Sequence, residues 1–194
     1  RKFPNAQLEF LIGDDHIERL HEWKDIHLLE EMVQFIVYDR IGYKHSLPKI
    51  AGRILDISST AIRQGDSFDT SPQVLSYMME RGLYLEEMLS SHLSKKRYEH
   101  VLRVTDLALE IGEIHGLDKH KLYLSAMYHD RYREMEFSQS RKRVSKSWRE
   151  MTSPAFDHAY LAADSLSRYF YVKDRDVLSA ILHHVDGKAQ NPYA

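Results

Sequence analysis

The chain has 194 residues and a formal net charge of −2, and its 43% hydrophobic and 29% charged content is that of an ordinary globular protein, which excludes a disordered or collagen-like chain. It has no cysteine, which excludes disulfides, a thiolate nucleophile and cysteine zinc sites, and leaves its 12 histidines and its carboxylates as the available metal ligands. No long apolar segment predicts a membrane span or a signal peptide and neither half is basic enough to predict nucleic-acid binding, so we expect a cytoplasmic protein.

The first 84 residues alternate strand-like and helix-like segments. Short apolar runs at Leu8–Ile12 and Val33–Tyr38 predict two buried strands. Between them, apolar residues recur at helical spacing over His16–Met32, so this region predicts a β-α-β unit and a parallel sheet. We expect a third strand near Arg53–Ile57.

Hydroxyl residues mark two helix starts after that strand. The run Ser58-Ser59-Thr60 suits the N-cap of a helix, and Ser71-Pro72 opens another that ends at Gly82. This part is therefore α/β. We place the domain boundary so that residues 1–84 form one domain and residues 85–194 the other.

From residue 85 onward we find no strand pattern. Asp118 and Asp174 are predicted N-caps, and Gly116 and Gly187 are predicted helix stops. Helical apolar stripes recur at Leu85-Met88-Leu89, Val101-Val104-Leu107-Ala108-Ile111, Leu122-Ala126-Met127, Leu161-Ala162-Leu166 and Val177-Leu178-Ile181-Leu182. The second domain is predicted to be all-α.

Four histidines lie on or beside these stripes, at positions that predict inward-facing side chains: His100, His129, His158 and His184. A single histidine on an apolar face is more often a hydrogen-bonded core residue than a ligand. Four of them in one small domain, with Asp130 directly after one, favour a metal site. Imidazole and carboxylate suit Fe, Mn, Zn, Co or Ni, a carboxylate can bridge two ions, and paired ions can clamp a phosphoryl group.

The segment 131–150 is rich in arginine and lysine. A solvated loop or helix face is the commoner outcome for such a run. The other interpretation is a guanidinium rim for a polyphosphate, formed by Arg131 and Arg133 with Arg141 or Arg143.

Four segments together resemble the ordered motifs of the HD-domain phosphohydrolases, within them the bacterial YqeK type: Arg97–His100, Ala126–Asp130, Phe156–Ala159 and Leu182–Gly187. The resemblance covers about residues 86–190. It implies a divalent-metal enzyme, with iron in a di-iron centre and Mn or Co as alternatives, that cleaves diadenosine tetraphosphate into two ADP. The implied metal ligands are His100, His129, Asp130, His158 and His184, with Asp130 bridging. Asp130 and Arg133 would be catalytic, and Arg131 and Arg133 would bind substrate.

This chain departs from that family in three places. Arg133 stands where the family usually has lysine, and Val185 where it has threonine. The family closes its site with a further aspartate, in an Ala-Asp context on a helix that follows the last histidine, and neither Asp164 nor Asp186 stands on such a helix. We therefore expect the HD-type domain to be incomplete at its C-terminal side.

Two features of residues 1–84 allow a structural or a binding interpretation. Trp23 is either a core residue or a stacking platform for an aromatic ring. The run Ser58-Ser59-Thr60 with Arg63 one turn later is either a simple N-cap or a phosphate cradle.

Four segments of this part resemble the C-terminal half of the bacterial nicotinate-nucleotide adenylyltransferases: Phe10–Asp15 with Trp23, Phe35–Arg40, Ile57–Arg63 and Ser71–Tyr84. The resemblance implies that Asp15 and Trp23 contact nicotinate mononucleotide and that Ser59, Thr60 and Arg63 face the phosphates of ATP. The phosphate-binding motif of that family lies upstream of Arg1, so we expect no adenylyl transfer from this chain alone.

The combined expectation is an α/β, partial Rossmann-like nucleotidyltransferase unit followed by an all-α HD domain, belonging to a bifunctional protein of NAD biosynthesis. Two alternatives stay open. Adenylyl transfer is the main role of the full-length protein, or the helical domain is a non-catalytic nucleotide sensor with a structural metal. The sequence leaves the identity of the metal and the oligomeric state open, a homodimer included.

Overall fold

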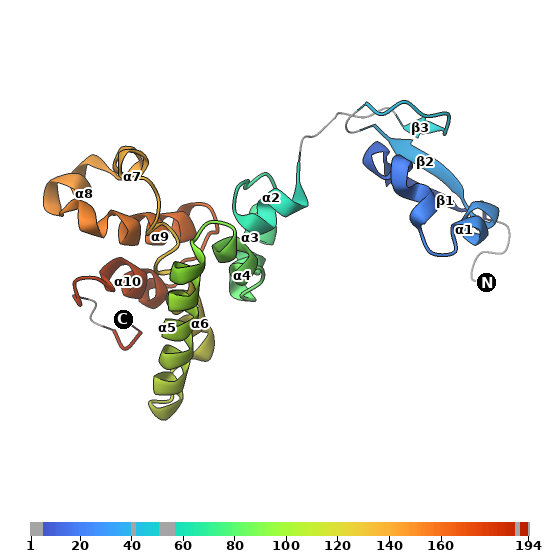
Figure 1. Cartoon of the computed structure of the whole chain (residues 1–194). Helices are drawn as coiled ribbons and strands as arrows, with labels where there is room; N and C mark the ends of the chain where they lie inside the picture. The colour runs from blue at the N-terminus through green and yellow to red at the C-terminus, as the bar shows by residue number, and fades with distance from the viewer. Residues whose placement is uncertain (1–5, 40–41, 51–56, 189–190, 194) are drawn as a thin grey trace. The chain divides into compact units, whose positions relative to one another are not determined.

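A computed structural model describes residues 6–39, 42–50, 57–188 and 191–193. The chain divides into two compact units, residues 1–57 and residues 58–194 (Figure 1). None of the helices in the described ranges combines the length and the apolar character that crossing a bilayer requires.

The first unit holds a small parallel sheet. Its strands are β1 (Glu9–Gly13), β2 (Gln34–Tyr38) and β3 (Lys49–Ile50), in the order β1-β2-β3. Phe10 pairs with Phe35 in the parallel β1–β2 ladder. The predicted parallel arrangement of the first two strands is thus confirmed. The third strand expected near residues 53–57 falls largely outside the described residues, and Ile57 itself is not in a strand.

The connection between β1 and β2 is two short helices instead of one. It consists of the 3₁₀ helix η1 (Asp14–Glu22) and α1 (Ile26–Met32). Asp25 has a φ of 57°, in the left-handed region, and this residue ends any continuous helix. The prediction of one continuous helix over His16–Met32 is therefore wrong, although the segment is helical on both sides of the interruption.

The core of the first unit is formed by Ile12, Ile26, Phe35 and Val37. The prediction that β1 is a buried strand is only half right, because Leu8 and Leu11 are more than half exposed. Successive strand residues point to opposite faces of a sheet. Ile12 packs against the helices described in this unit, Leu11 points to the opposite face, and Leu8 lies on the Ile12 side just before the strand begins.

The regular structure of the second unit is helical in its described residues, so the all-α prediction for the HD-type part of the chain is confirmed. Nine α-helices and one 3₁₀ helix follow one another in the described residues: α2 (Ser59–Gln64), α3 (Pro72–Glu80), α4 (Leu85–Ser90), α5 (Lys95–Ile114), α6 (Lys119–Tyr128), α7 (Phe137–Arg143), α8 (Lys146–Met151), η2 (Pro154–Phe156), α9 (Asp157–Arg168) and α10 (Arg175–His183). Helices α5 and α6 lie side by side, and α9 packs on α10 (Figure 1).

The predicted caps are present. Ser58 accepts from the Ala61 N–H and Ser71 from the Val74 N–H. Asp118 and Asp174 each accept two backbone N–H groups at the starts of α6 and α10. These bonds satisfy donors that a helix start otherwise leaves without partners.

The two units meet in the chain at residues 57/58, whereas the expected domain boundary lies at 84/85. The reason lies in the helical core. Ile62 of α2 and Leu75 and Met79 of α3 are buried in the same cluster as Met88 and Ile181. Residues 58–84 therefore belong to the helical unit in space, and the boundary between the two sequence resemblances at 84/85 stays a prediction.

Close packing of α5 on α6 positions His100, which lies on α5, and His129, which follows α6. A Cβ at Gly112 would collide with Cδ1 of Leu122, so the small residue lets the two helices approach. This approach fixes α5, which carries His100, against α6, which leads to His129.

Candidate metal centre

Asp130 is the centre of a polar cluster in the helical unit. Its Oδ2 lies 3.4 Å from His129 Nε2 and 3.8 Å from His100 Nε2. Its Oδ1 lies 3.4 Å from His158 Nε2 and 3.7 Å from His184 Nε2. The side chain of Asp130 is only 6% exposed. The four histidines thus form two groups that share one buried carboxylate.

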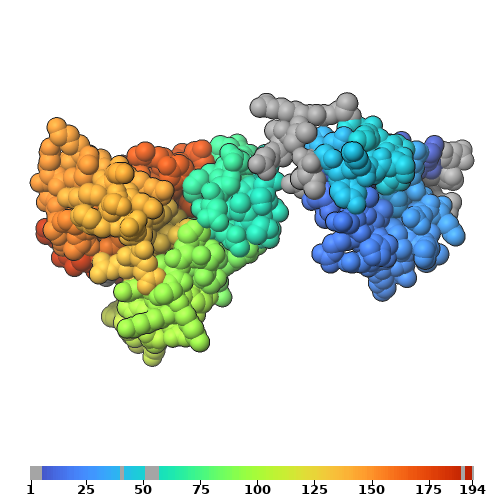
Figure 2. Space-filling model, turned by 45° about the horizontal axis from the view of Figure 1, so that its top comes forward, coloured from blue at the N-terminus to red at the C-terminus, as the bar shows by residue number. Residues whose placement is uncertain are grey.

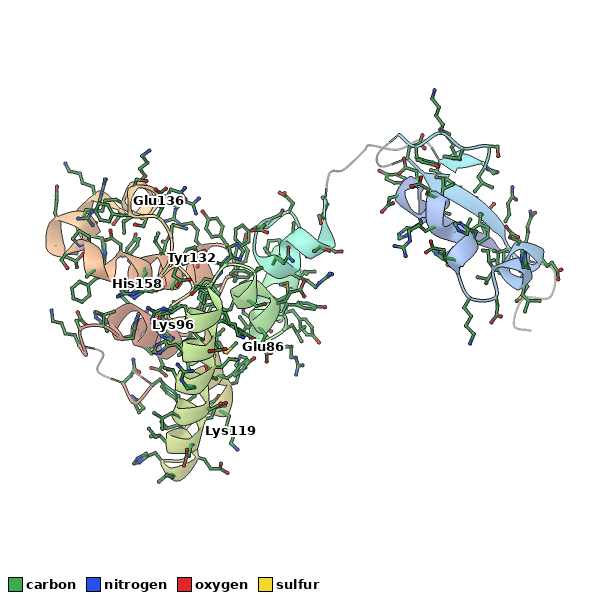
Figure 3. All side chains as sticks on the ribbon, viewed as in Figure 1. Glu86, Lys96, Lys119, Tyr132, Glu136 and His158 are labelled. Carbon is green, nitrogen blue, oxygen red and sulfur yellow. The ribbon has the colours of Figure 1, made fainter. Side chains whose placement is uncertain are left out.

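Four helices bring these side chains together. His100 lies in the second turn of α5, and His129 and Asp130 directly follow the end of α6. His158 lies in the first turn of α9, and His184 directly follows α10. Figure 3 places the labelled His158 where α9 faces α10. The site exists because helices far apart in the sequence end or begin at the same point.

Backbone carbonyls fix the orientation of two imidazoles. His129 Nδ1 lies 2.6 Å from the Ala126 carbonyl, and His184 Nδ1 lies 2.7 Å from the Ile181 carbonyl. A carbonyl only accepts, so Nδ1 carries the proton in each ring. The Nε2 lone pairs of both rings then face Asp130, which is the arrangement that metal-binding histidines use.

His158 has a different environment. Its Nε2 lies 3.2 Å from His184 Nε2, and its Nδ1 lies 3.1 Å from Arg133 Nη1. Burial, the Arg133 cation and His184 together lower the pKa of His158 to about 4. The ring is therefore neutral near pH 7, the state in which imidazole can bind a metal.

Asp130 is ionised in this environment. Its burial alone would raise the pKa, but the interactions with the surrounding imidazoles of His129, His184 and His158 hold the pKa of the Asp130 carboxyl well below its usual range. Arg97 Nη1 also donates to Oδ2 at 3.1 Å. The result is a carboxylate whose two oxygens each face a pair of imidazoles.

The donor set fits divalent transition-metal ions. Two groups have ligand atoms within 4.8 Å of one another, His100-His129-Asp130 and Asp130-His158-His184. The approach of two Nε2 atoms to 3.2 Å is costly unless a proton or a cation lies between their lone pairs. Imidazole and carboxylate are the ligands of such metals, so the cluster could hold a metal ion in either group.

The structure brings together all five side chains for which the sequence predicts ligation, and their assignment as ligands stays a prediction. No sixth ligand joins them among the described residues. Asp186 Oδ1 is bonded to His183 Nδ1 at 3.1 Å, and Asp164 is paired with Arg168 at 2.9 Å.

The predicted arginine rim separates into different places. Arg133 lies beside His158, at the cluster. Arg141 donates to Asp157 at 2.7 Å and to the Arg149 carbonyl, so it ties α7 to α8 and to the start of α9. Arg131 is buried and lines a separate cavity together with Arg143. Only Arg133 of these four contacts the histidine cluster within the described part of the chain.

Arg97 is the functional candidate that the sequence interpretation missed. It lies three residues before His100 on α5, and residues at this spacing share a helix face. The signal was therefore present, because a side chain one turn before an inward-facing histidine also points toward the cluster.

The predicted nucleotide-binding residues are divided between the units. In the first unit, Trp23 packs against the core and lies edge-on to Phe10, and Asp15 lies 4.0 Å from His16. In the helical unit, Arg63 donates to Glu87 and to the Thr60 hydroxyl, and Ser59 and Thr60 open α2. Their predicted contacts with nucleotides stay predictions.

Known proteins support this description of the cluster. Residues 97–193, half of the chain, match the family described as HD domain, and all five cluster residues lie within the match. The chain belongs to the HD-domain family.

Curated relatives match both parts of the chain. A protein of Mycoplasma pneumoniae named "Probable nicotinate-nucleotide adenylyltransferase/Ap4A hydrolase" is 29% identical over 200 aligned positions, covering 95% of this chain and 56% of the relative. A "Bis(5'-nucleosyl)-tetraphosphatase, symmetrical" of Halalkalibacterium halodurans is 28% identical over 114 positions, covering 57% of this chain and 60% of the relative. A "Probable nicotinate-nucleotide adenylyltransferase" of Methylacidiphilum infernorum is 37% identical over 97 positions, covering 43% of this chain and 47% of the relative.

The chain spans a little over half the length of the Mycoplasma pneumoniae relative. The two resemblances inferred from the sequence, to the HD phosphohydrolases and to the adenylyltransferases, are confirmed by these matches.

Proposed function

We propose that the helical unit is a divalent-metal-dependent phosphohydrolase that cleaves diadenosine tetraphosphate into two ADP. The observation that carries the proposal is the position of Asp130, whose two oxygens each face a separate pair of histidines. The names of the Mycoplasma pneumoniae and Halalkalibacterium halodurans relatives support the substrate and the symmetrical cleavage.

The histidines would hold the ions through Nε2, and Asp130 would bridge them. Iron is the first candidate, with manganese and cobalt as alternatives, because all three accept this ligand set. Ions bound there would polarise a phosphoryl group and activate water for attack on phosphorus. In the reaction, water adds to one of the two central phosphorus atoms and the bond to their bridging oxygen breaks, so that each ADP leaves with a complete terminal phosphate.

Two arginines of the chain would stabilise negative charge in the site during phosphoryl transfer. Arg133 lies at the edge of the cluster beside His158, where its guanidinium can bind the departing phosphate. Arg97 donates to Asp130 and balances the negative charge of the shared carboxylate. Hydrogen bonds to the Ala126 and Ile181 carbonyls would keep His129 and His184 oriented during turnover.

The test is metal content and hydrolysis of diadenosine tetraphosphate in Asp130→Asn, which keeps the shape and removes the charge of the shared ligand. We expect loss of bound metal and at least a 100-fold loss of turnover, an order of magnitude typical of removing a charge-stabilising group at a reaction centre. The matched control is Asp106→Asn on the exposed face of α5, which should retain metal and activity. Unchanged turnover in Asp130→Asn would refute the proposal, and bound metal in wild-type protein without hydrolysis would favour a sensor with a structural metal.

A second function concerns the protein to which residues 1–84 belong. We propose that they form part of a Rossmann-like adenylyltransferase that transfers the adenylyl group of ATP to nicotinate mononucleotide and releases pyrophosphate. Asp15 and Trp23 would contact the mononucleotide, and Ser59, Thr60 and Arg63 would contact ATP. The parallel β1–β2 pair and the Methylacidiphilum infernorum relative support this. Dinucleotide formation by a protein that includes upstream sequence is the test, and a Trp23→Ala variant should raise the KM for the mononucleotide more than that for ATP.

A further inference from the structure

A second polar cavity lies in the helical unit, away from the histidine cluster. It has a volume of about 690 Å³ and is lined by the turn after α2, the segment after α6, and α9. None of the five cluster residues lines it. In Figure 2 the teal surface of residues 58–75 adjoins the orange surfaces of the later helices of the same unit.

A buried arginine whose Nε has no hydrogen-bond partner among the described residues faces this cavity. Arg131 is 6% exposed, and its Nε is buried with no hydrogen-bond partner. Its guanidinium lies over the ring of Tyr132 at 5.1 Å, which compensates for only part of the lost hydration. No ion pair of Arg131 is found within the described ranges, and a buried cation that lacks an anion is unfavourable because its lost hydration is not replaced. An anionic group bound in the cavity would therefore stabilise the Arg131 guanidinium.

The acidic residues of the same cavity are already paired. Asp66 accepts from His92 Nε2 at 2.8 Å, and Asp164 accepts from Arg168 at 2.9 Å. Arg143 also lines the cavity, and no ion pair of its guanidinium is found within the described ranges. Arg131 and Arg143 are therefore the two lining cations left for a ligand.

The rest of the wall is aromatic and apolar. Phe68 and Tyr169 stack with ring centroids 4.5 Å apart, and Tyr132, Met135 and Leu161 line the cavity beside them. Guanidinium forks match phosphate oxygens, and a wall of rings accepts an aromatic group of the ligand. The volume falls within the range of about 300–1,000 Å³ that is usual for small-molecule sites.

We propose that this cavity is a binding site for a mononucleotide, whose phosphate is held by Arg131 and Arg143 and whose base lies against the aromatic wall. The site is separate from the metal centre. It therefore gives the protein a way to bind a nucleotide that is not the molecule being hydrolysed.

The experiment is calorimetric titration of AMP into the full chain, both as purified and after removal of metal with a chelator. We expect one AMP per chain with an affinity that chelation leaves unchanged. Arg131→Met should weaken AMP binding at least about tenfold, the loss expected for a charge-assisted hydrogen bond. Arg143→Met should do the same, and because Arg143 is exposed its replacement is compatible with folding. The control Arg149→Met, an exposed arginine of α8 outside the cavity, should bind AMP like the wild type.

Inorganic phosphate serves as the second probe. It should bind at least tenfold more weakly than AMP, because it makes no contact with the rings. Equal affinities would overturn the assignment of a nucleotide. Absence of AMP binding, loss of it on chelation, or equal affinities in Arg143→Met and the wild type would overturn the site itself. None of these results depends on hydrolysis at Asp130, so the outcome is separable from that of the proposed function.

Discussion

The two histidine groups that share Asp130 differ in exposure and in their neighbours. His100, in the first group, has a side chain that is 42% exposed, and Arg97 donates to the Asp130 oxygen of that group. His158, in the second group, is 6% exposed and lies 3.2 Å from His184 Nε2. We expect the more buried group, which contains His158, to bind a cation more tightly than the more exposed group, which contains His100. In the exposed group the Arg97 guanidinium also competes with a cation for Oδ2 of Asp130. We therefore expect unequal metal positions, a tight one at His158-His184 and a weaker one at His100-His129.

The largest effect should come from removing one ligand of each group in turn. His158→Ala is expected to lower the affinity for one ion by about 100-fold or more, since even the loss of an outer partner costs about 10–100-fold. His100→Ala should lower the affinity for the other ion by about tenfold. Competition with a chromogenic chelator, together with metal content per chain, measures both. His115→Ala, at the exposed end of α5, is the control, and equal losses in the two ligand variants would contradict the inequality.

The pH dependence of the metal-free protein tests the burial of the second group. The pKa of His158 is lowered from 6.5 to about 4, so between these values the unfolded chain binds a proton that the folded chain does not. The free energy of unfolding should therefore fall as the pH drops from about 6.5 to 4, by up to ~3 kcal/mol. Chemical unfolding at pH 7.0 and pH 5.0 measures this. His158→Gln should lose less stability over that interval, and an identical loss in both proteins would show that another group is responsible.

Gly112→Ala tests whether the close packing of α5 on α6 holds the His100-His129 group in place. The added methyl group meets Leu122 and forces α5 away from α6, which should destabilise the protein by about 1–3 kcal/mol. Because these helices carry His100 and lead to His129, the weaker metal position should lose more affinity than the tighter one, which shares only Asp130 with them. Thermal unfolding and metal titration report the two effects, and equal loss at both positions would mean that the groups are not separately supported.

The smallest expected effect is that of Arg97→Met. Removing the guanidinium frees Oδ2 of Asp130, and the weaker metal position should gain affinity by a few-fold, in keeping with one partly exposed charge contact. Arg103→Met, on the exposed surface of α5, removes the same charge without touching Asp130 and should change the affinity less. A loss of affinity in Arg97→Met would mean that the arginine orients the carboxylate instead of competing for it.

Helical periodicity made much of the histidine cluster predictable. The apolar stripes of α6 and α9 indicate which way His129 and His158 point, and capping residues such as Asp118 and Asp174 fix where helices begin. The stripe predicted around His100 is less buried than expected, because Leu107 and Ile111 on α5 are exposed. The direction of a side chain cannot be predicted from helical periodicity once the helix has ended. Arg131 and Arg133 follow α6 in a turn, and no pattern of spacing could tell that one faces a separate cavity and the other the histidines.

The first unit was less predictable for a related reason. Apolar spacing over residues 16–32 is continuous, but the left-handed conformation of Asp25 interrupts the helix. The division at residues 57/58 also escaped prediction, because it depends on Leu75 and Met79 packing against helices that come much later in the chain. Local patterns carry no information about such distant partners.

The contact between Arg133 and His158 links the arginine to the protonation of the imidazole. Arg133 Nη1 can donate to Nδ1 of His158 only while Nδ1 carries no proton. If His158 were to hold a metal ion through Nε2, the proton of the neutral ring would lie on Nδ1, facing the Ala155 carbonyl. Arg133 would then lose this contact, and its guanidinium would be able to bind the phosphate of a substrate.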